Sequence, residues 1–412
     1  RDNPYTTPVL KEVVADSYQR LIAPAIEREL RNELTEKAED ESIKVFKKNL
    51  QQLLMQPPIV GKVVLGWDPA FRTGCKLAVV DETGKVLDTV VIYPTAPTTP
   101  AKIASAKEIL KKLNKIIVGK EAVLEKTLMA ILSRGHILLD DVPGVGKTTL
   151  ALACSKVLGL DYHRIQFTPD VVPSDIIGFS MYNKESGTFE YKPGVVMTNL
   201  LLADEINRTS SKTQSALLEV MEEGQVTVDG ETHELPKPFV VLATQNPVGS
   251  AGTQLLPQAQ LDRFMIRMEM GYPDFQSQVN ILRDRQTENP LDKAEQVTST
   301  DEILEMQDEV TQIYIEDKIL EYVTSLAMNT REQEMIRLGV SPRGALAVTR
   351  LAKARAYVQG RDYVTPEDVQ KVFLDVCAHR IILNPKAKIA ALSASDVLIE
   401  VLKQTKSPDN GR

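Results

Sequence analysis

The sequence has few cysteines, scattered histidines and no long apolar run. Cys75, Cys154 and Cys377 are far apart and form no C-x-x-C pair, so the sequence indicates neither a disulfide framework nor a thiolate metal site. The four histidines are also dispersed along the chain. No apolar run approaches the roughly 18–20 residues that a membrane-spanning helix needs, so we expect no membrane span. Together these absences favour a protein of the reducing cytoplasm.

The chain also lacks an excess of basic residues. Its 49 Lys and Arg are outnumbered by 56 Asp and Glu, which gives a formal net charge of -7 and argues against a dominant nucleic-acid-binding surface. The length of 412 residues allows about two to four domains. A hydrophobic content of 43% and a charged content of 25% are ordinary for a globular protein.

The first third of the chain has two kinds of sequence pattern. Residues 1–58 carry the apolar spacing of helices, which the prolines at 57 and 58 end. Residues 59–113 predict a strand meander with a hairpin turn at Asp81–Gly84, followed by a Pro/Thr-rich link at 93–100 and a helix. The predicted strands and helix of this part cover residues 62–67, 76–80, 86–92 and 102–113.

From residue 114 the pattern changes to strands that alternate with helices, the signature of a parallel α/β sheet. We place this α/β domain at 114–274, an all-helical domain at 275–405 and a tail at 406–412. The strands expected to be buried are 136–139, 163–166, 200–203, 239–243 and 264–269. The helices expected after them are 275–288, 300–310, 316–331, 342–359, 366–382 and 394–404.

Residues 136–150 hold the most informative motif. An apolar strand enters a loop that ends in Gly146-Lys147-Thr148, and a helical segment follows at once, which is the context that a phosphate-binding P-loop needs. Lys147 would reach the β- and γ-phosphates of a nucleotide, and Thr148 would bind Mg²⁺. Asp141 replaces the first glycine of the usual G-x-x-x-x-G-K-[ST] spacing. The loop residues predicted to bind nucleotide are Pro143, Gly144, Val145, Gly146, Lys147, Thr148 and Thr149.

Polar side chains follow two further strands. Asp204 and Glu205 end an apolar strand, and Asn246 follows the next one. The carboxyl ends of parallel strands meet at one edge of a sheet, so we expect all three side chains to face the P-loop. Asp204 would then bind Mg²⁺, Glu205 would polarise the attacking water, and Asn246 would orient that water. Taken singly, the acids also fit an exposed strand end, and the asparagine also fits a turn.

Two arginines are candidates for stabilising charge on the transferred phosphate. Arg263 lies just before the last strand, and Arg343 opens a helix of the helical domain. Each alone also fits an ordinary surface or salt-bridge arginine.

Taken together, these residues resemble the MoxR group of AAA+ ATPases over about residues 114–405. The segments that carry the resemblance are Ile117–Lys120, Asp141–Thr148, Leu202–Arg208, Ala243–Pro247, Leu256–Phe264 and Ser341–Arg343. The resemblance makes Val118 and Gly119 part of the adenine side of the site. Asp141, which departs from the usual P-loop spacing, is familiar at this position in the family. Gln258, in contrast, stands where the family commonly has Glu.

The same resemblance implies a P-loop α/β domain with a helical lid, and ATP and Mg²⁺ as cofactors. Arg263 would act on a neighbouring subunit's nucleotide and Arg343 would sense nucleotide from the lid, within a homo-oligomeric ring that we expect to be a hexamer. Residues 179–194 and 225–234 would form two hairpins that contact client protein. Proteins with von Willebrand factor A domains are the implied partner class.

Residues 1–113 resemble part of the Tex family of transcription accessory proteins. The match centres on Asp68-Pro-Ala-Phe-Arg-Thr-Gly-Cys-Lys76 and implies a partial RNase H-like domain after a helical segment. Asp68 would be the first metal-binding carboxylate of an RNase H-like nuclease, but two-metal chemistry needs further acids that we do not find. The chain therefore has the form of a chimera, joined near Leu113–Lys115.

We expect an ATPase that converts ATP and water to ADP and phosphate, and that remodels or matures partner proteins. Two alternatives stay open. The Tex-like part would suit a nucleic-acid-associated transcription accessory factor, which salt-sensitive RNA or DNA binding would favour. The second alternative is a nucleotide-binding scaffold that does not hydrolyse ATP. The presence of Lys147, Asp204, Glu205 and Arg263 together argues against it.

Overall fold

The computed structural model describes residues 3–54, 62–68, 75–83, 85–92, 100–246, 256–284 and 289–408. These form two units, 1–92 and 93–412, which we describe one at a time. Several sequence predictions lie outside the described residues. They concern the helix stop at 56–58, the Tex-like motif from 69 to 74, Gly84, the link at 93–99, Pro247, the helix end at 285–288 and the tail from 409 to 412.

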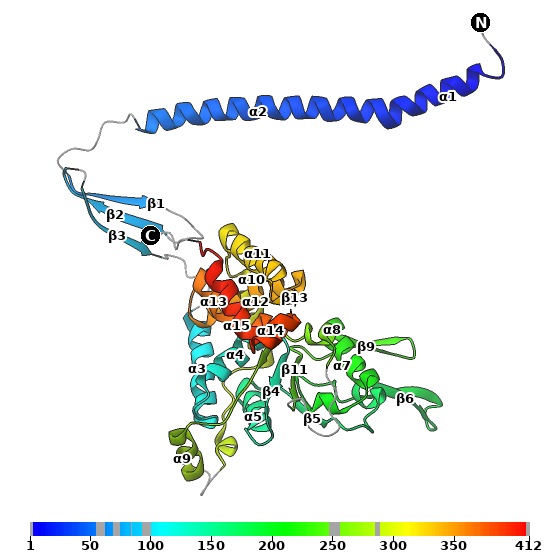
Figure 1. The fold of residues 1–412 in the computed structure, drawn as a ribbon, viewed down its shortest axis with the longest axis vertical. Helices are drawn as coiled ribbons and strands as arrows, with labels where there is room; N and C mark the ends of the chain where they lie inside the picture. Colours follow the sequence, from blue (N-terminus) through cyan, green and yellow to red (C-terminus); the bar gives the residue numbers. More distant parts are fainter. Residues whose placement is uncertain are drawn as a thin grey trace. The chain divides into compact units, whose positions relative to one another are not determined.

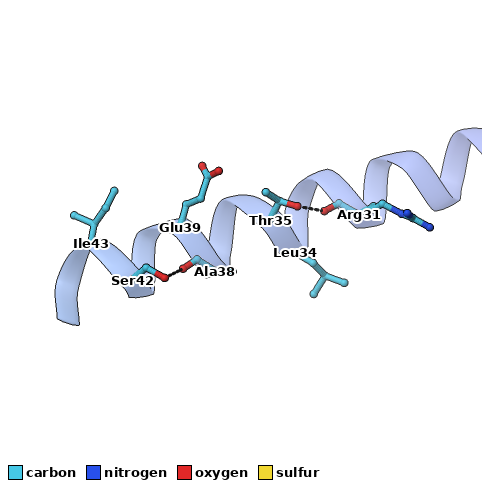
Figure 2. Close-up of a pocket in the computed structure, with 7 residues that line it drawn as sticks. All are labelled: Arg31, Leu34, Thr35, Ala38, Glu39, Ser42 and Ile43. Atoms are coloured by element: carbon cyan, nitrogen blue, oxygen red, sulfur yellow. Dashed lines mark hydrogen bonds between the residues drawn. The ribbon is translucent and has the colours of Figure 1, made fainter. Parts of the chain in front are cut away.

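The first unit begins with a long helical segment. It consists of α1 (Thr7–Ser17), a π-helical turn η1 (Tyr18–Ile22) and α2 (Ala23–Leu54). Pro24 explains the turn, because proline has no N–H to continue the regular hydrogen bonds; the N–H of Ala23 instead bonds to the carbonyl of Tyr18. Figure 2 shows Leu34 and Ile43 pointing away from α2 in different directions, and they are 67% and 63% exposed. The apolar side chains of this helix therefore do not form one covered face.

The first unit also contains a three-stranded antiparallel sheet. Its strands are β1 (Val64–Asp68), β2 (Cys75–Val80) and β3 (Val86–Ile92), in the order β1-β2-β3, as the sequence predicted. At the predicted turn, the Asp81 carboxylate accepts hydrogen bonds from the backbone N–H groups of Thr83 and Lys85, at 2.8 and 3.0 Å.

A five-stranded parallel sheet organises the second unit (Figure 1). Its strands, in spatial order, are β12 (Ile266–Met268), β4 (Ile137–Asp140), β11 (Val240–Gln245), β8 (Leu200–Asp204) and β5 (Tyr162–Gln166). Alternate side chains of the inner strands belong to two apolar cores. Leu202 packs in the core that contains α3 (Pro100–Ile116), α4 (Glu121–Leu132) and α5 (Lys147–Leu158). Leu201 packs in the core that contains α6 (Pro173–Ile177) and α7 (Ser211–Glu223).

Two hairpins extend this sheet domain. They are β6–β7 (Gly178–Asn183 and Thr188–Pro193) and β9–β10 (Gln225–Val228 and Glu231–Glu234), each antiparallel. They coincide with the two hairpins predicted at 179–194 and 225–234. Short helical turns complete the domain at η2 (Ile206–Arg208) and α8 (Gln258–Leu261).

The helix predicted at 102–113 is α3. Its Ala106, Ile109 and Leu113 are buried, and they belong to the same apolar core as α4, α5 and the lid. This helix therefore packs within the second unit.

The lid is helical, as predicted. Its elements are α9 (Phe275–Asp284), η3 (Pro290–Lys293), α10 (Thr300–Gln312), α11 (Asp317–Glu332), α12 (Pro342–Val358), α13 (Pro366–Cys377), α14 (Pro385–Ile389) and α15 (Ala394–Gln404). The lid also holds a short antiparallel strand pair, β13 (Ile336–Leu338) and β14 (Ile382–Leu383), which the sequence analysis missed. The helix predicted at 366–382 is shorter in the structure, where α13 ends at Cys377. Among the described residues, no helix is long and apolar enough to cross a bilayer.

Candidate nucleotide site

The predicted P-loop connects β4 to α5. Gly144 and Gly146 adopt φ values of 89° and 101°, which only glycine adopts without strain. A Cβ atom on Gly144 would meet no atom within 4 Å, so the loop is open on that side, and Pro143 and Gly144 are exposed. Gly146 caps the N-terminus of α5, where unpaired backbone N–H groups favour an anion.

Asp141 has a structural role at the position where the usual motif has glycine. It is buried, and its carboxylate accepts hydrogen bonds from the backbone N–H groups of Met270 and Gly271, at 2.6 and 2.7 Å. The side chain thus ties the start of the P-loop to the segment that follows β12.

Lys147 is buried at the start of α5, and its Nζ donates to the carbonyl oxygen of Asp141 at 2.7 Å. Burial lowers the pKa of Lys147 from its ordinary value, whereas the nearby carboxylates, first that of Asp204, act to raise it. The acids at the end of β8 therefore lie within electrostatic reach of the P-loop lysine. Val145, Thr148 and Thr149 are half-buried beside it.

Asp204 is the last residue of β8, and its two carboxylate oxygens have different partners. Oδ1 accepts from the Thr244 hydroxyl at 2.6 Å, and Oδ2 accepts from Nη2 of Arg164 at 2.7 Å. The Thr244 oxygen in turn accepts from the backbone N–H of Glu205 at 2.9 Å. Thr244 on β11 thereby fixes both acids at the edge of the sheet.

Glu205 adopts a left-handed backbone conformation with φ 58°, which is uncommon for a residue other than glycine. Its Oε1 accepts from Nδ2 of Asn246 at 2.7 Å, and its Oε2 accepts from Nε2 of Gln166 at 2.8 Å. Arg208 forms an ion pair with Oε2 at 3.0 Å. Polar donors on three sides therefore hold the carboxylate in place.

Asn246 has one buried atom without a partner. Its Oδ1 makes no hydrogen bond, although Nδ2 binds Glu205 and the backbone is bonded to Asn207. A buried oxygen of this kind needs a donor. A water molecule beside Asn246 would supply one, so the orphaned oxygen fits the predicted role of Asn246 in orienting water.

The structure also brings together residues that the sequence analysis missed. Arg164 and Gln166 alternate on β5, which is an edge strand with exposed His163, Arg164 and Gln166 and not the buried strand expected. In the parallel register Gln166 lies opposite Asp204. The polar alternation of β5 was the available signal, but its pairing with β8 is not visible in the sequence.

The residues predicted to lie on the adenine side are found where the domain meets α9. Gly119 has φ 73°, and a Cβ atom there would come within 2.1 Å of the Ser277 hydroxyl oxygen, so only glycine allows this contact. Val118 beside it is half-buried.

Arg263 and Arg343 meet at one carboxylate. Nε of Arg263 donates to Oε2 of Glu222 at 3.0 Å, and Nη2 of Arg343 donates to Oε1 of the same residue. The hydrogen bond from Arg343 is the main reason that the pKa of Glu222 lies below its ordinary value. Glu222, near the end of α7, was not singled out in the sequence.

The residues present fit ATP and Mg²⁺. The open glycine loop and the α5 N-terminus suit phosphate groups. Among the described residues, no cluster of three or more His, Cys, Asp or Glu could hold a metal ion on its own. Mg²⁺ does not need such a cluster, because one or two protein ligands and substrate phosphates hold it; Thr148 and Asp204 stay the predicted ligands.

The fold and this site define a P-loop ATPase of the AAA class with a lid. Residues 136–266 match the family described as ATPase family associated with various cellular activities (AAA), and residues 328–400 match the AAA lid domain. The chain is 46% identical over 299 residues to an uncharacterized protein, YeaC, of Bacillus subtilis, which covers 73% of this chain and 93% of that protein. It is 38% identical over 317 residues to chaperone MoxR1 of Mycobacterium tuberculosis, covering 75% of this chain and 84% of that protein.

The crystal structure of a candidate ATPase from Cytophaga hutchinsonii superposes with a TM-score of 0.70 at 39% identity, covering 75% of this chain and 96% of that one. The chain belongs to the MoxR family of AAA ATPases.

The N-terminal part has different relatives. Residues 62–123 match the Tex protein YqgF-like domain. Protein tex of Bordetella pertussis is 49% identical over 88 residues, which are 21% of this chain and 11% of that protein. The chain therefore joins a MoxR-like ATPase to a part of a Tex-like protein.

Proposed function

We propose that this protein is a Mg²⁺-dependent ATPase that couples hydrolysis to the remodelling of partner proteins. The observation that carries the hydrolytic step is the pairing of Glu205 with Asn246, whose Oδ1 is buried and has no partner. The amide nitrogen of Asn246 faces Glu205, so the acceptors open to a water molecule are Oδ1 of Asn246 and the remaining lone pairs of the carboxylate. The left-handed backbone at Glu205 and the Thr244 hydrogen bond keep this geometry in place.

The reaction then follows from the arrangement of the side chains. Backbone N–H groups of the P-loop and Lys147 bind the β- and γ-phosphates of ATP. Glu205 accepts a proton as the water oxygen attacks the γ-phosphorus, the bond to the β–γ bridging oxygen breaks, and ADP and phosphate leave. Mg²⁺, when bound, neutralises phosphate charge. Arg263 of a neighbouring subunit would stabilise the charge that develops on the transferred group.

A ring follows from this use of Arg263. In the single chain Arg263 binds Glu222 of its own α7, so a second subunit would bring it to a nucleotide. We propose a homo-oligomeric ring, with a hexamer as the expected form. The similarity to a relative named as a chaperone supports protein remodelling as the output, and proteins with von Willebrand factor A domains stay the proposed partner class.

The β6–β7 hairpin supplies an apolar surface for a client. Phe179, Met181, Tyr182 and Phe189 are each about half exposed or more, at 50%, 48%, 51% and 73%, and the hairpin projects from the second unit (Figure 1). Exposed aromatic residues on a hairpin suit binding to unfolded polypeptide. The transcription-accessory alternative rests on the N-terminal match, and salt-dependent RNA binding by the full chain would favour it.

The test of the hydrolytic step is ATP turnover by the wild type and by Glu205→Gln. The variant keeps the shape of the side chain but cannot accept the proton, so we expect turnover to fall about 10²- to 10⁴-fold while a fluorescent ADP analogue still binds. Glu321→Gln, an exposed change on α11, is the matched control. A wild type that binds ATP but has no turnover would instead support the non-hydrolysing scaffold.

A further inference from the structure

One lid arginine, Arg380, is buried against the segment that carries Arg263. Arg380 lies three residues after α13 and is 4% exposed. Its guanidinium contacts residues 262–265, which connect α8 to β12. A buried cation of this kind is costly unless each of its N–H groups finds a partner.

The partners of Arg380 surround Arg263 in sequence. Its Nε donates to Oδ1 of Asp262 at 2.7 Å, and its Nη2 donates to the carbonyl oxygens of Asp262 and Phe264, at 3.1 and 2.6 Å. Its Nη1 donates to the carbonyl oxygen of Met265 at 3.1 Å and to that of Val376. The residues on both sides of Arg263 are thus held by one planar group.

The same network includes the segment that carries Arg343. The Ser341 hydroxyl donates to Oδ2 of Asp262 at 3.3 Å. A Cβ atom on Gly344 would come within 3.0 Å of Cδ of Arg380, so the start of α12 packs closely on the Arg380 side chain. Asp262 and Arg380 therefore link the two segments whose arginines meet at Glu222.

The guanidinium is the chemical group that suits this position. It offers five N–H donors in a fixed plane, whereas the lysine ammonium has three donors on a flexible stem. Here the donors serve one carboxylate and several backbone carbonyls at the junction of lid and sheet domain. A lysine would keep the positive charge opposite Asp262 but would leave carbonyl oxygens unpaired.

We propose that Arg380 is a positioning residue for ATP hydrolysis, which acts from the lid by fixing the segment that carries Arg263. This inference rests on the proposed function, because it requires Arg263 to act on a nucleotide. Since a misplacement of about 1 Å can cost on the order of 100-fold in rate, loss of the network lowers kcat. Binding of an ADP analogue in the same subunit is unchanged, because the P-loop residues make none of these contacts.

The test compares Arg380→Lys, Asp262→Asn and Arg263→Ala in the full-length protein. For Arg380→Lys we expect kcat to fall about ten- to hundred-fold, with affinity for a fluorescent ADP analogue and ring size unchanged. Asp262→Asn leaves Arg380 in place and decides the question if circular dichroism shows that Arg380→Lys does not fold. Arg337→Lys, an exposed arginine of the lid, is the matched control.

Mixed rings separate positioning from a merely structural role. Glu205→Gln subunits lack the predicted proton acceptor but retain Arg263 and Arg380, so mixing them with Arg380→Lys subunits should raise turnover above that of either protein alone. The inference is overturned if this rescue is absent. It is also overturned if Arg380→Lys and Asp262→Asn both keep wild-type kcat while Arg263→Ala is inactive. Either outcome leaves the proposed function standing. Wild-type turnover by Arg263→Ala would overturn the proposed role of Arg263 itself.

Discussion

At the residue scale, His136 shows how a buried titratable group joins three elements. It precedes β4, its Nε2 lies 3.0 Å from the carbonyl oxygen of Met221 in α7, and its Nδ1 lies 3.0 Å from the backbone nitrogen of Val241 in β11. A neutral ring satisfies both contacts, with Nε2–H as donor and Nδ1 as acceptor. Burial lowers the pKa of His136 to about 4 from 6.5, so the folded protein holds this side chain neutral.

Stability should therefore decrease as the pH falls below 6.5. Between that pH and about 4 the unfolded chain binds a proton at this position and the folded chain does not, which costs about 1.4 kcal/mol for each pH unit. Burial also lowers the pKa of His379, so its contribution has the same sign. We predict that, between pH 6.5 and 5, the unfolding free energy of the wild type decreases by about 2 kcal/mol more than that of His136→Asn. Urea unfolding followed by circular dichroism measures both free energies, and equal pH dependence in the two proteins would refute the prediction.

The site residues that belong to a local sequence motif could be predicted from the sequence. The P-loop lysine and the two acids after an apolar strand are local patterns, and the structure places Asp204, Glu205 and Asn246 at one edge of the sheet. Arg164, Gln166 and Thr244 were missed because each acts through a neighbouring strand. Glu222 and Arg380 make contacts across the junction of lid and sheet domain. Arg380 and Asp262, for example, are more than a hundred residues apart in the sequence, so no local pattern predicts their contact.

At the element scale, periodicity predicted the type of most helices and strands, and neighbours decided the rest. The strand at 163–166 was expected to be buried as one strand of a parallel sheet, yet the strand order puts β5 at the sheet edge. The pair β13–β14 has three and two residues, which is too short for any periodic signal. The helix at 102–113 was predicted from the sequence, but the unit in which it packs was not.

The β6–β7 hairpin is the surface that we expect to bind client protein. Replacing Phe189, which is 73% exposed, by serine removes aromatic surface without loss of a buried contact. We expect Phe189→Ser to bind fluorescently labelled casein, an unfolded polypeptide, about tenfold more weakly, with basal ATP turnover unchanged. Glu185→Ser, at the exposed turn of the same hairpin, should bind like the wild type. Equal affinity of all three proteins in fluorescence anisotropy would rule out this hairpin as the client surface.

At the scale of the whole molecule, the chain combines parts of two families. The ATPase spans most of the length of YeaC and MoxR1, whereas the match to protein tex spans 11% of that protein. The motif order along the sequence was sufficient to predict that a Tex-like part precedes a MoxR-like part. It does not place one part relative to the other, because no local pattern encodes contacts between separate units.

In the mechanism that we propose, ATP hydrolysis needs a second subunit, which contributes Arg263. The most direct measurement is ATP turnover per subunit over a range of protein concentrations, for the wild type and Arg263→Ala, with light scattering on the same samples. We predict that wild-type turnover per subunit rises as rings form, and that Arg263→Ala forms the same rings but turns over about 10³-fold or more slowly. Wild-type turnover that is independent of concentration and of assembly, or equal turnover by the variant, would contradict the account.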